Sequence, residues 1–130
     1  MSKKIILIAE DEPYIREVIK AMLDEIGNFE IIEASDAGEL VDFARKVHPD
    51  LIITDVIMPG NDAYHALGEL KKDEEFKNIP VIFESALMSD RAVFETHAPP
   101  GRSFFLVKPF KFDEFVQALN KMLPPEKNER

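Results

Sequence analysis

The sequence predicts a single α/β domain built on one parallel sheet with helices on both faces. Short apolar runs alternate with amphipathic stretches along nearly the whole chain. The apolar runs are continuous and do not alternate with polar residues, which is typical of parallel strands that helices cover on both sides. The 130 residues suit one domain with a proper core, and no linker, repeat or low-complexity segment indicates a second domain.

Five strands and five helices are expected in strict alternation. The expected strands are residues 5–9, 29–33, 51–54, 80–84 and 104–107. The expected helices are residues 14–26, a second that follows Asp36 and runs to about 47, a third near 63–72, a fourth from about Ser89, and a last one that begins near Phe112 and ends before Pro124.

Capping and breaking residues support these boundaries. Gly27 follows the first helix, and His48-Pro49 ends the second. Asp36 precedes the second helix with Glu39 three residues further on, which is the spacing of an N-cap pair. The inward faces follow the helical period, and in the last helix they are Phe112, Phe115, Val116, Leu119 and Leu123.

The charge and composition exclude several classes of function. Sixteen basic residues against 25 acidic ones give a formal charge of −9, which opposes direct binding to nucleic acid or to an anionic membrane. Cysteine is absent, so disulfides and thiol chemistry are excluded, as expected for a cytoplasmic protein. The first apolar run is too short for a signal peptide or a membrane span.

Five polar residues follow the expected strands at one edge of the sheet. Right-handed crossovers favour the strand order 2-1-3-4-5, a flavodoxin-like three-layer sandwich, and such sheets bind ligands beyond the carboxyl ends of their strands. In that order Glu10 and Asp11 end the first strand, Asp55 the third, Ser85 the fourth and Lys108 the fifth.

These residue types suit phosphoryl transfer. Three carboxylates at one edge repel one another unless a divalent cation lies between them, and hard oxygen ligands suit Mg²⁺. Lys108 can pair with Asp55 at rest and with phosphoryl oxygens later, while Ser85 can donate one hydrogen bond to the same oxygens. Asp55 faces both the metal ion and Lys108, so it should stay ionised and is the expected nucleophile.

Each of these residues also has a simpler interpretation. Taken singly, an acid at a strand end is usually a helix cap or a solvated loop residue, and Ser85 and Lys108 would belong to a turn and a surface loop. Their arrival from four separate segments favours a site. Histidines 48, 65 and 97 lack metal-ligand spacing and are expected to be surface or packing residues.

At these positions the chain resembles the receiver domain of two-component response regulators, from Ile5 to about Leu123. The resemblance rests on the segments Ile-Leu-Ile-Ala-Glu-Asp-Glu-Pro (residues 6–13), Pro-Asp-Leu-Ile-Ile-Thr-Asp (49–55) with Met-Pro-Gly (58–60), Pro-Val-Ile (80–82) with Ser-Ala (85–86), and Val-Lys-Pro-Phe (107–110).

The resemblance implies that Asp55 accepts a phosphoryl group from a phosphohistidine of a sensor histidine kinase or a histidine phosphotransfer protein. It also implies Mg²⁺, with Mn²⁺ as an alternative, held by Asp11, Asp55 and the backbone carbonyl of Ile57 with Glu10 assisting. Ser85 would move toward the phosphoryl group, Lys108 would be its cation, and the Lys108-Pro109 bond would be cis.

Several positions depart from the usual family pattern. Glu10 stands where aspartate is more common, and Phe105 occupies the switch position without a tyrosine hydroxyl, so burial of its ring would have to mark the active state. Ile57 and Leu87 occupy two variable positions, each two residues past a key residue; both are apolar and offer nothing to orient an attacking water, which predicts slow self-dephosphorylation. Pro99-Pro100 is expected to end the fourth helix early.

The resemblance implies a receiver domain over residues 1–123 followed by a polar tail, 124–130. We expect a stand-alone, chemotaxis-type receiver, a monomer or weak dimer that catalyses only its own phosphorylation and dephosphorylation and signals through another protein. Two alternatives are a degenerate receiver acting as a scaffold and an N-terminal receiver truncated from a longer regulator. A haloacid-dehalogenase-like phosphatase would need a second acid at Ile57, and a flavin site is disfavoured because Glu10-Asp11-Glu12-Pro13 repels phosphate.

Overall fold

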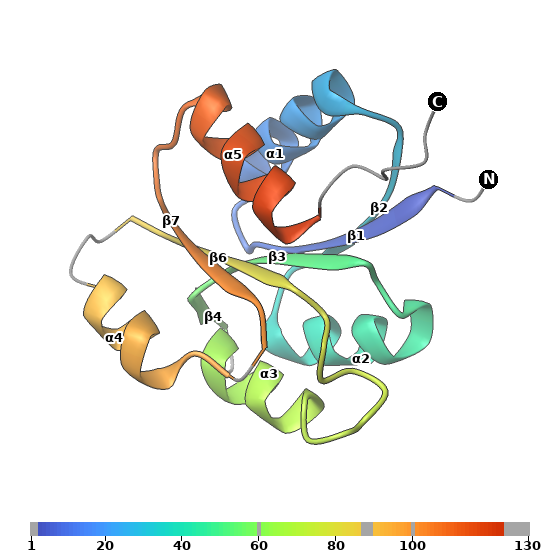
Figure 1. Ribbon diagram of the computed structural model, residues 1–130, viewed down its shortest axis with the longest axis vertical. Coiled ribbons are helices and arrows are strands. Elements are labelled where there is room, and N and C mark those ends of the chain that lie inside the picture. The colour runs from blue at the N-terminus through green and yellow to red at the C-terminus, as the bar shows by residue number, and fades with distance from the viewer. Residues whose placement is uncertain (1–2, 60, 87–89, 100, 124–130) are drawn as a thin grey trace.

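A computed structural model of the chain describes residues 3–59, 61–86, 90–99 and 101–123. One five-stranded parallel sheet has the order β2-β1-β3-β6-β7 (Figure 1). Its strands are β1 (Lys4–Ala9), β2 (Phe29–Ala34), β3 (Leu51–Asp55), β6 (Val81–Ser85) and β7 (Ser103–Val107). Because β6 and β7 are the fourth and fifth strands of this sheet, the predicted order 2-1-3-4-5 is confirmed. The expected tail, 124–130, lies outside the described residues.

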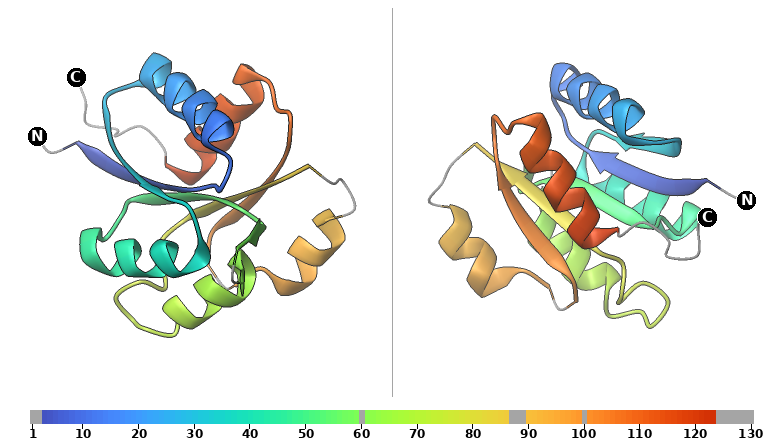
Figure 2. Two further views of the ribbon diagram at one scale, coloured as in Figure 1. Left: turned by 180° about the vertical axis from the view of Figure 1, so that it is seen from behind. Right: turned by 45° about the horizontal axis from the view of Figure 1, so that its top comes forward.

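Helices cover both faces of the sheet and complete a three-layer sandwich (Figure 2). One face carries α1 (Pro13–Ile26) and α5 (Phe112–Met122), and the other carries α2 (Ala37–Val47), α3 (Ala63–Leu70) and α4 (Asp90–His97). Within the described part of the chain, no helix is long and apolar enough to cross a membrane.

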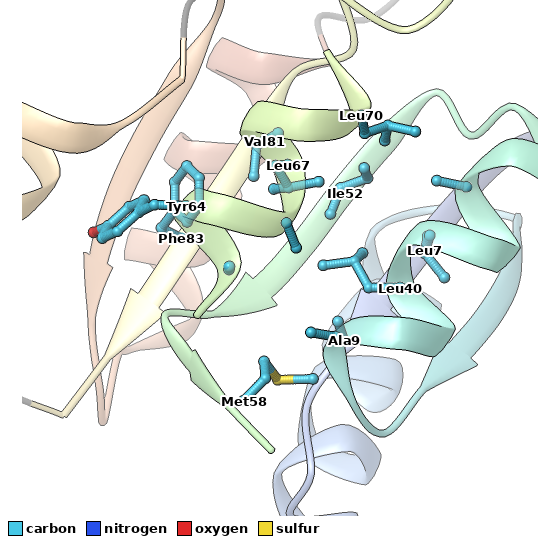
Figure 3. Packing of buried hydrophobic residues seen from close by; sticks show 14 of the residues in the cluster. Leu7, Ala9, Leu40, Ile52, Met58, Tyr64, Leu67, Leu70, Val81 and Phe83 are labelled. Carbon is cyan, nitrogen blue, oxygen red and sulfur yellow. The ribbon is translucent and has the colours of Figure 1, made fainter. Parts of the chain in front are cut away.

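Successive strand residues point to opposite faces and form two cores. Ile6 and Ile8 of β1 pack with α1 and α5, whereas Leu7 between them packs toward α2 and α3. Figure 3 shows the second core, in which Leu7 and Ile52 of the sheet lie against Leu40 of α2. The continuous apolar strands predicted this burial on both faces.

The turn after β3 contains structure that the sequence did not predict. Strands β4 (Ile57–Met58) and β5 (Asn61–Asp62) pair antiparallel as a short hairpin, where only a turn was expected. The Asp62 carboxylate accepts a 2.8 Å hydrogen bond from the backbone N–H of His65 and so caps α3. Helix α3 ends at Leu70, two residues before the predicted end at 72.

One predicted inward residue of the last helix is wrong. Phe112, the first residue of α5, is 44% exposed. The neighbouring Phe110 is half-buried and stacks on Phe115 at 5.6 Å between ring centroids. The buried positions of α5 are Phe115, Ala118, Leu119 and Met122.

The fourth helix is short, as the prolines predict. Helix α4 ends at His97, and Pro99 is buried two residues further on. None of the eight residues of α4 is fully buried. Pro100 lies outside the described residues.

Candidate functional site

The three strand-end acids meet at one edge of the sheet. Strands β1 and β3 pair in a parallel register that sets Ala9 beside Thr54, so the residues that follow them become neighbours. Each of Glu10, Asp11 and Asp55 offers a carboxylate oxygen, and these oxygens lie within 4.8 Å of one another. Glu10 is wholly buried, Asp55 is half-buried and Asp11 is exposed.

Lys108 supplies positive charge to this cluster. Its Nζ lies 3.4 Å from Oε1 of Glu10 and 3.4 Å from Oδ2 of Asp55. Its backbone N–H donates a 2.7 Å hydrogen bond to the carbonyl of Ser85, which ties the end of β7 to the end of β6. The Lys108-Pro109 peptide bond is cis, as the resemblance implied.

Hydrogen bonds from α1 and β2 hold the acidic end of β1 in place. The Arg16 guanidinium donates to the backbone carbonyl of Glu10 at 2.6 Å and to the Glu33 carboxylate at 3.0 Å. The backbone N–H of Glu10 donates to the carbonyl of Ala34 at 3.0 Å. Lys20 also pairs with Glu33 at 3.0 Å, and these contacts fix the backbone from which Glu10 and Asp11 project.

Lys108 alone does not offset the effect of burial on the pKa values of Glu10 and Asp55. Burial raises the pKa of Glu10, the nearby Asp55 raises it further, and Lys108 opposes both effects. Burial also raises the pKa of Asp55 by more than Lys108 lowers it. Lys108 thus lowers the pKa of Asp55, as expected from the sequence, but not enough to offset the effect of burial. The arrangement therefore favours a further cation beside these carboxylates. The carboxylate oxygens are the hard ligands that Mg²⁺ prefers.

Ser85 reaches the same sheet edge but its hydroxyl points elsewhere. Ser85 ends β6 and pairs in register with Val107, next to Lys108. Its hydroxyl donates a hydrogen bond to the carboxylate of Asp90, the first residue of α4. The structure therefore brings Glu10, Asp11, Asp55 and Lys108 together, and it directs the Ser85 hydroxyl toward α4.

The remaining predicted residues that the structure describes lie outside the acidic cluster. Ile57 lies in β4 just beyond Asp55 with its side chain 67% exposed, and the Phe105 ring in β7 is buried. His48 stacks on Phe76 at 5.0 Å between ring centroids, which agrees with a packing role. Leu87, the second residue expected to affect dephosphorylation, lies outside the described residues.

Glu84 is a site residue that the sequence reasoning missed. It lies in β6 opposite Asp55 of β3 and is wholly buried. Within the described part of the chain, neither of its carboxyl oxygens has a hydrogen-bond partner. Burial raises the pKa of Glu84 to about 8, with Glu10 adding to the shift and Lys108 opposing it. The available signal was an acid near the end of an otherwise apolar strand.

The family of the chain follows from comparison with known proteins. Residues 6–120 match the response regulator receiver domain. The chain belongs to this family. A receiver domain is the phosphorylated, signal-receiving part of a response regulator in two-component systems, so the chain takes part in phosphorylation-based signalling.

Curated relatives extend beyond the receiver domain. The chain is 35% identical over 121 residues to response regulator Rre1 of Synechocystis, covering 91% of this chain and 51% of the relative. It is 38% identical over 115 residues to the transcriptional regulatory protein PdtaR of Mycobacterium tuberculosis, covering 88% and 54%. The chain thus spans about half the length of the curated relatives it matches.

Solved receiver structures share the fold. Response regulator TrrA of Thermotoga maritima, determined in complex with Mg²⁺ and BeF, is 33% identical with a TM-score of 0.79, covering 92% of this chain and 99% of that one. The receiver domain of a sensor histidine kinase from Pseudomonas aeruginosa is 28% identical with a TM-score of 0.81, covering 95% and 100%. That structure has a magnesium ion coordinated in its active-site cleft.

Proposed function

We propose that Asp55 of this receiver domain accepts a phosphoryl group in a Mg²⁺-dependent reaction. The donor is a phosphohistidine on a sensor histidine kinase or a histidine phosphotransfer protein. The observation that supports this most directly is the position of the Asp55 carboxylate, 3.4 Å from the Lys108 ammonium and inside the cluster with Glu10 and Asp11. That arrangement combines a nucleophile with charge to stabilise transferring oxygens.

The transfer exchanges one bond for another. A carboxylate oxygen of Asp55 forms a bond to phosphorus while the phosphorus–nitrogen bond of the phosphohistidine breaks. The imidazole nitrogen keeps the electron pair of the broken bond and takes up a proton. Lys108, which pairs with Asp55 before the reaction, then pairs with the phosphoryl oxygens.

The acids of the cluster fit a divalent cation. Asp11, Asp55 and the backbone carbonyl of Ile57, with Glu10 assisting, would hold Mg²⁺ or Mn²⁺. The bound ion would neutralise the carboxylates and the incoming phosphoryl oxygens. The magnesium in the Pseudomonas receiver domain supports this assignment.

A groove beside the site is suited to a protein donor. It has a volume of about 450 Å³ and lies between α1 and the segment after β7, with Lys108 in its wall. Tyr14 lines it from α1 with a side chain that is 76% exposed, and Phe110 lines it from the other side. A partner that fills this groove would present its histidine next to Lys108.

Labelling with a small phosphodonor tests the proposal. Acetyl phosphate with Mg²⁺ should add one phosphoryl group to the protein, and EDTA or Asp55→Asn should abolish the addition. Asp42→Asn is the matched control, because Asp42 is an exposed aspartate on α2, and it should be labelled like the parent protein. Labelling that persists in Asp55→Asn would overturn the assignment. No labelling of the parent protein would favour the scaffold alternative.

We also propose that the phosphorylated domain signals by contact with another protein. The acidic composition, with a formal charge of −9, supports a protein target over nucleic acid for this segment. Capture of partners with and without beryllofluoride, which mimics a phosphoryl group, tests this proposal. A partner whose retention does not change with beryllofluoride would contradict it.

A further inference from the structure

The Ser85 hydroxyl has one hydrogen atom to donate, and it donates this atom in a hydrogen bond to the Asp90 carboxylate. Ser85 is buried at the end of β6, and its hydroxyl donates to Oδ2 of Asp90 at the start of α4. A hydroxyl can donate only one hydrogen bond at a time. While Asp90 accepts this bond, Ser85 cannot donate to an oxygen atom bound at Asp55.

The same hydrogen bond anchors a weakly packed helix. Helix α4 lies near the β7 edge of the sheet, and none of its eight residues is fully buried (Figure 1). Its packing includes Phe94, which lies 5.8 Å from Phe83 and 5.4 Å from Phe105 between ring centroids, and Arg91, whose guanidinium carbon lies 5.1 Å from the Phe105 ring centroid. The hydrogen bond from Ser85 to Asp90 links the first residue of this helix to the end of β6.

A second hydroxyl, that of Tyr64, is affected by the charge of Asp90. Tyr64 of α3 packs against Phe83 at 4.8 Å between ring centroids (Figure 3), and its hydroxyl is buried with no hydrogen-bond partner among the described residues. Burial raises the pKa of Tyr64 to about 12, and the charges of Asp90 and Asp62 add to this shift. The charge of Asp90 therefore acts on the Tyr64 hydroxyl, while its carboxylate accepts the hydrogen bond from Ser85.

We propose that Asp90 is a positioning residue that competes with a phosphoryl group on Asp55 for the Ser85 hydroxyl. When Asp55 carries the phosphoryl group, the Ser85 hydrogen bond passes from the Asp90 carboxylate to a phosphoryl oxygen, which carries more negative charge. Asp90 then loses its link to β6, and the first turn of α4 is released. The proposal rests on the function proposed for Asp55 and adds a device that couples the site to α4.

A double-mutant cycle with beryllofluoride tests the competition. In Mg²⁺, Asp90→Ala should bind beryllofluoride about three- to tenfold more tightly than the parent protein, the effect of one hydrogen bond. In the Ser85→Ala background the same change should alter affinity less than about twofold, because the hydroxyl is gone. Glu95→Ala removes one exposed charge from the same helix and controls for net charge. Affinities are measured by calorimetry.

The outcomes separate the two proposals. Tightening of equal size in both backgrounds would overturn the competition, since it would be a charge effect alone. Unchanged or weaker binding by Asp90→Ala would also overturn it, and weaker binding is what a purely structural role predicts. If the parent protein and Asp55→Asn bind beryllofluoride equally, the function proposed for Asp55 fails, and this inference fails with it.

Hydrogen exchange provides a readout that does not require the variants to bind. The backbone amides of α4 should exchange faster in the parent protein when beryllofluoride and Mg²⁺ are added, and faster in Asp90→Ala without them. Circular dichroism confirms that Asp90→Ala is folded. Unchanged α4 exchange in both experiments would overturn the release of the helix.

Discussion

Glu84 lies directly opposite Asp55 across the paired strands β6 and β3, and its carboxyl group is wholly buried. Its pKa of about 8 means that this group is mostly protonated at neutral pH, since burial disfavours the charged form. The acidic edge of the sheet thus contains a fourth carboxyl group that is held in its neutral form beside three that can bind a cation.

The first prediction concerns the pH dependence of stability. Folded Glu84 keeps its proton up to about pH 8, whereas an unfolded glutamate loses it near 4.5, so the folded state binds more protons between these values. The free energy of unfolding contributed by Glu84 is therefore present at low pH and is lost as pH rises toward 8. Glu84→Gln should lose less stability than the parent protein between about pH 6 and about pH 8.5.

Urea unfolding of both proteins at the two pH values measures this difference. The lower pH is chosen to stay above the isoelectric point of about 4.8. Equal pH dependence in the two proteins would show that Glu84 is not held in its neutral form.

The second prediction concerns Lys108. Lys108→Met removes the ammonium that lies 3.4 Å from both Glu10 and Asp55, so it should lower the free energy of unfolding by about 1–3 kcal/mol without Mg²⁺. It should also tighten Mg²⁺ binding, because the cation no longer competes with the ammonium for the same oxygens. Thermal unfolding with and without Mg²⁺, and calorimetry, measure the two effects.

Lys111→Met is the matched control for that experiment. Lys111 is an exposed lysine three residues further along, so its replacement should change stability by less than about 0.5 kcal/mol. If Lys108→Met is as stable as this control without Mg²⁺, the ion pairs of Lys108 with Glu10 and Asp55 contribute nothing to the free energy of unfolding.

The third prediction concerns the lifetime of the acyl phosphate. The exposed apolar side chain of Ile57 offers no hydrogen bond to an attacking water, so self-dephosphorylation should be slow. Ile57→Asn should speed it by roughly tenfold, which is about 1.4 kcal/mol in the barrier. Loss of phosphate from the isolated, labelled protein measures the rate. A lifetime of seconds that Ile57→Asn does not change would contradict the prediction.

The fourth prediction concerns the start of α2. The Asp36 carboxylate accepts a 2.8 Å hydrogen bond from the backbone N–H of Glu39, and the Glu39 side chain accepts one at 2.8 Å from the backbone N–H of Ser35. Asp36→Ala should lower the free energy of unfolding by about 1 kcal/mol in urea denaturation. Asp42→Ala, on the exposed side of α2, should have a much smaller effect. Equal losses would show that the cap adds no stability.

Most of the fold could be predicted because its signals are local. The alternation of continuous apolar runs with helical periods predicted the elements, and the right-handed crossover limited the order of the strands. Once that order was given, the placement of Glu10 and Asp11 beside Asp55 followed, because parallel strands end at the same edge. The short β4–β5 hairpin was missed because two-residue strands carry no periodic signal.

The sequence by itself determined the fold class, the order of the strands, and the meeting of Glu10, Asp11, Asp55 and Lys108 at the edge of the sheet. Only the tertiary structure decided where the side chains of Glu84, Ser85 and Phe112 point. The pattern of β6 does not reveal which of its residues face which helix layer, so neither the burial of Glu84 nor the direction of the Ser85 hydroxyl toward Asp90 could be read from spacing. The physical reason is that these orientations depend on how the helices pack against the sheet and against one another, which the local pattern of apolar and polar residues does not encode.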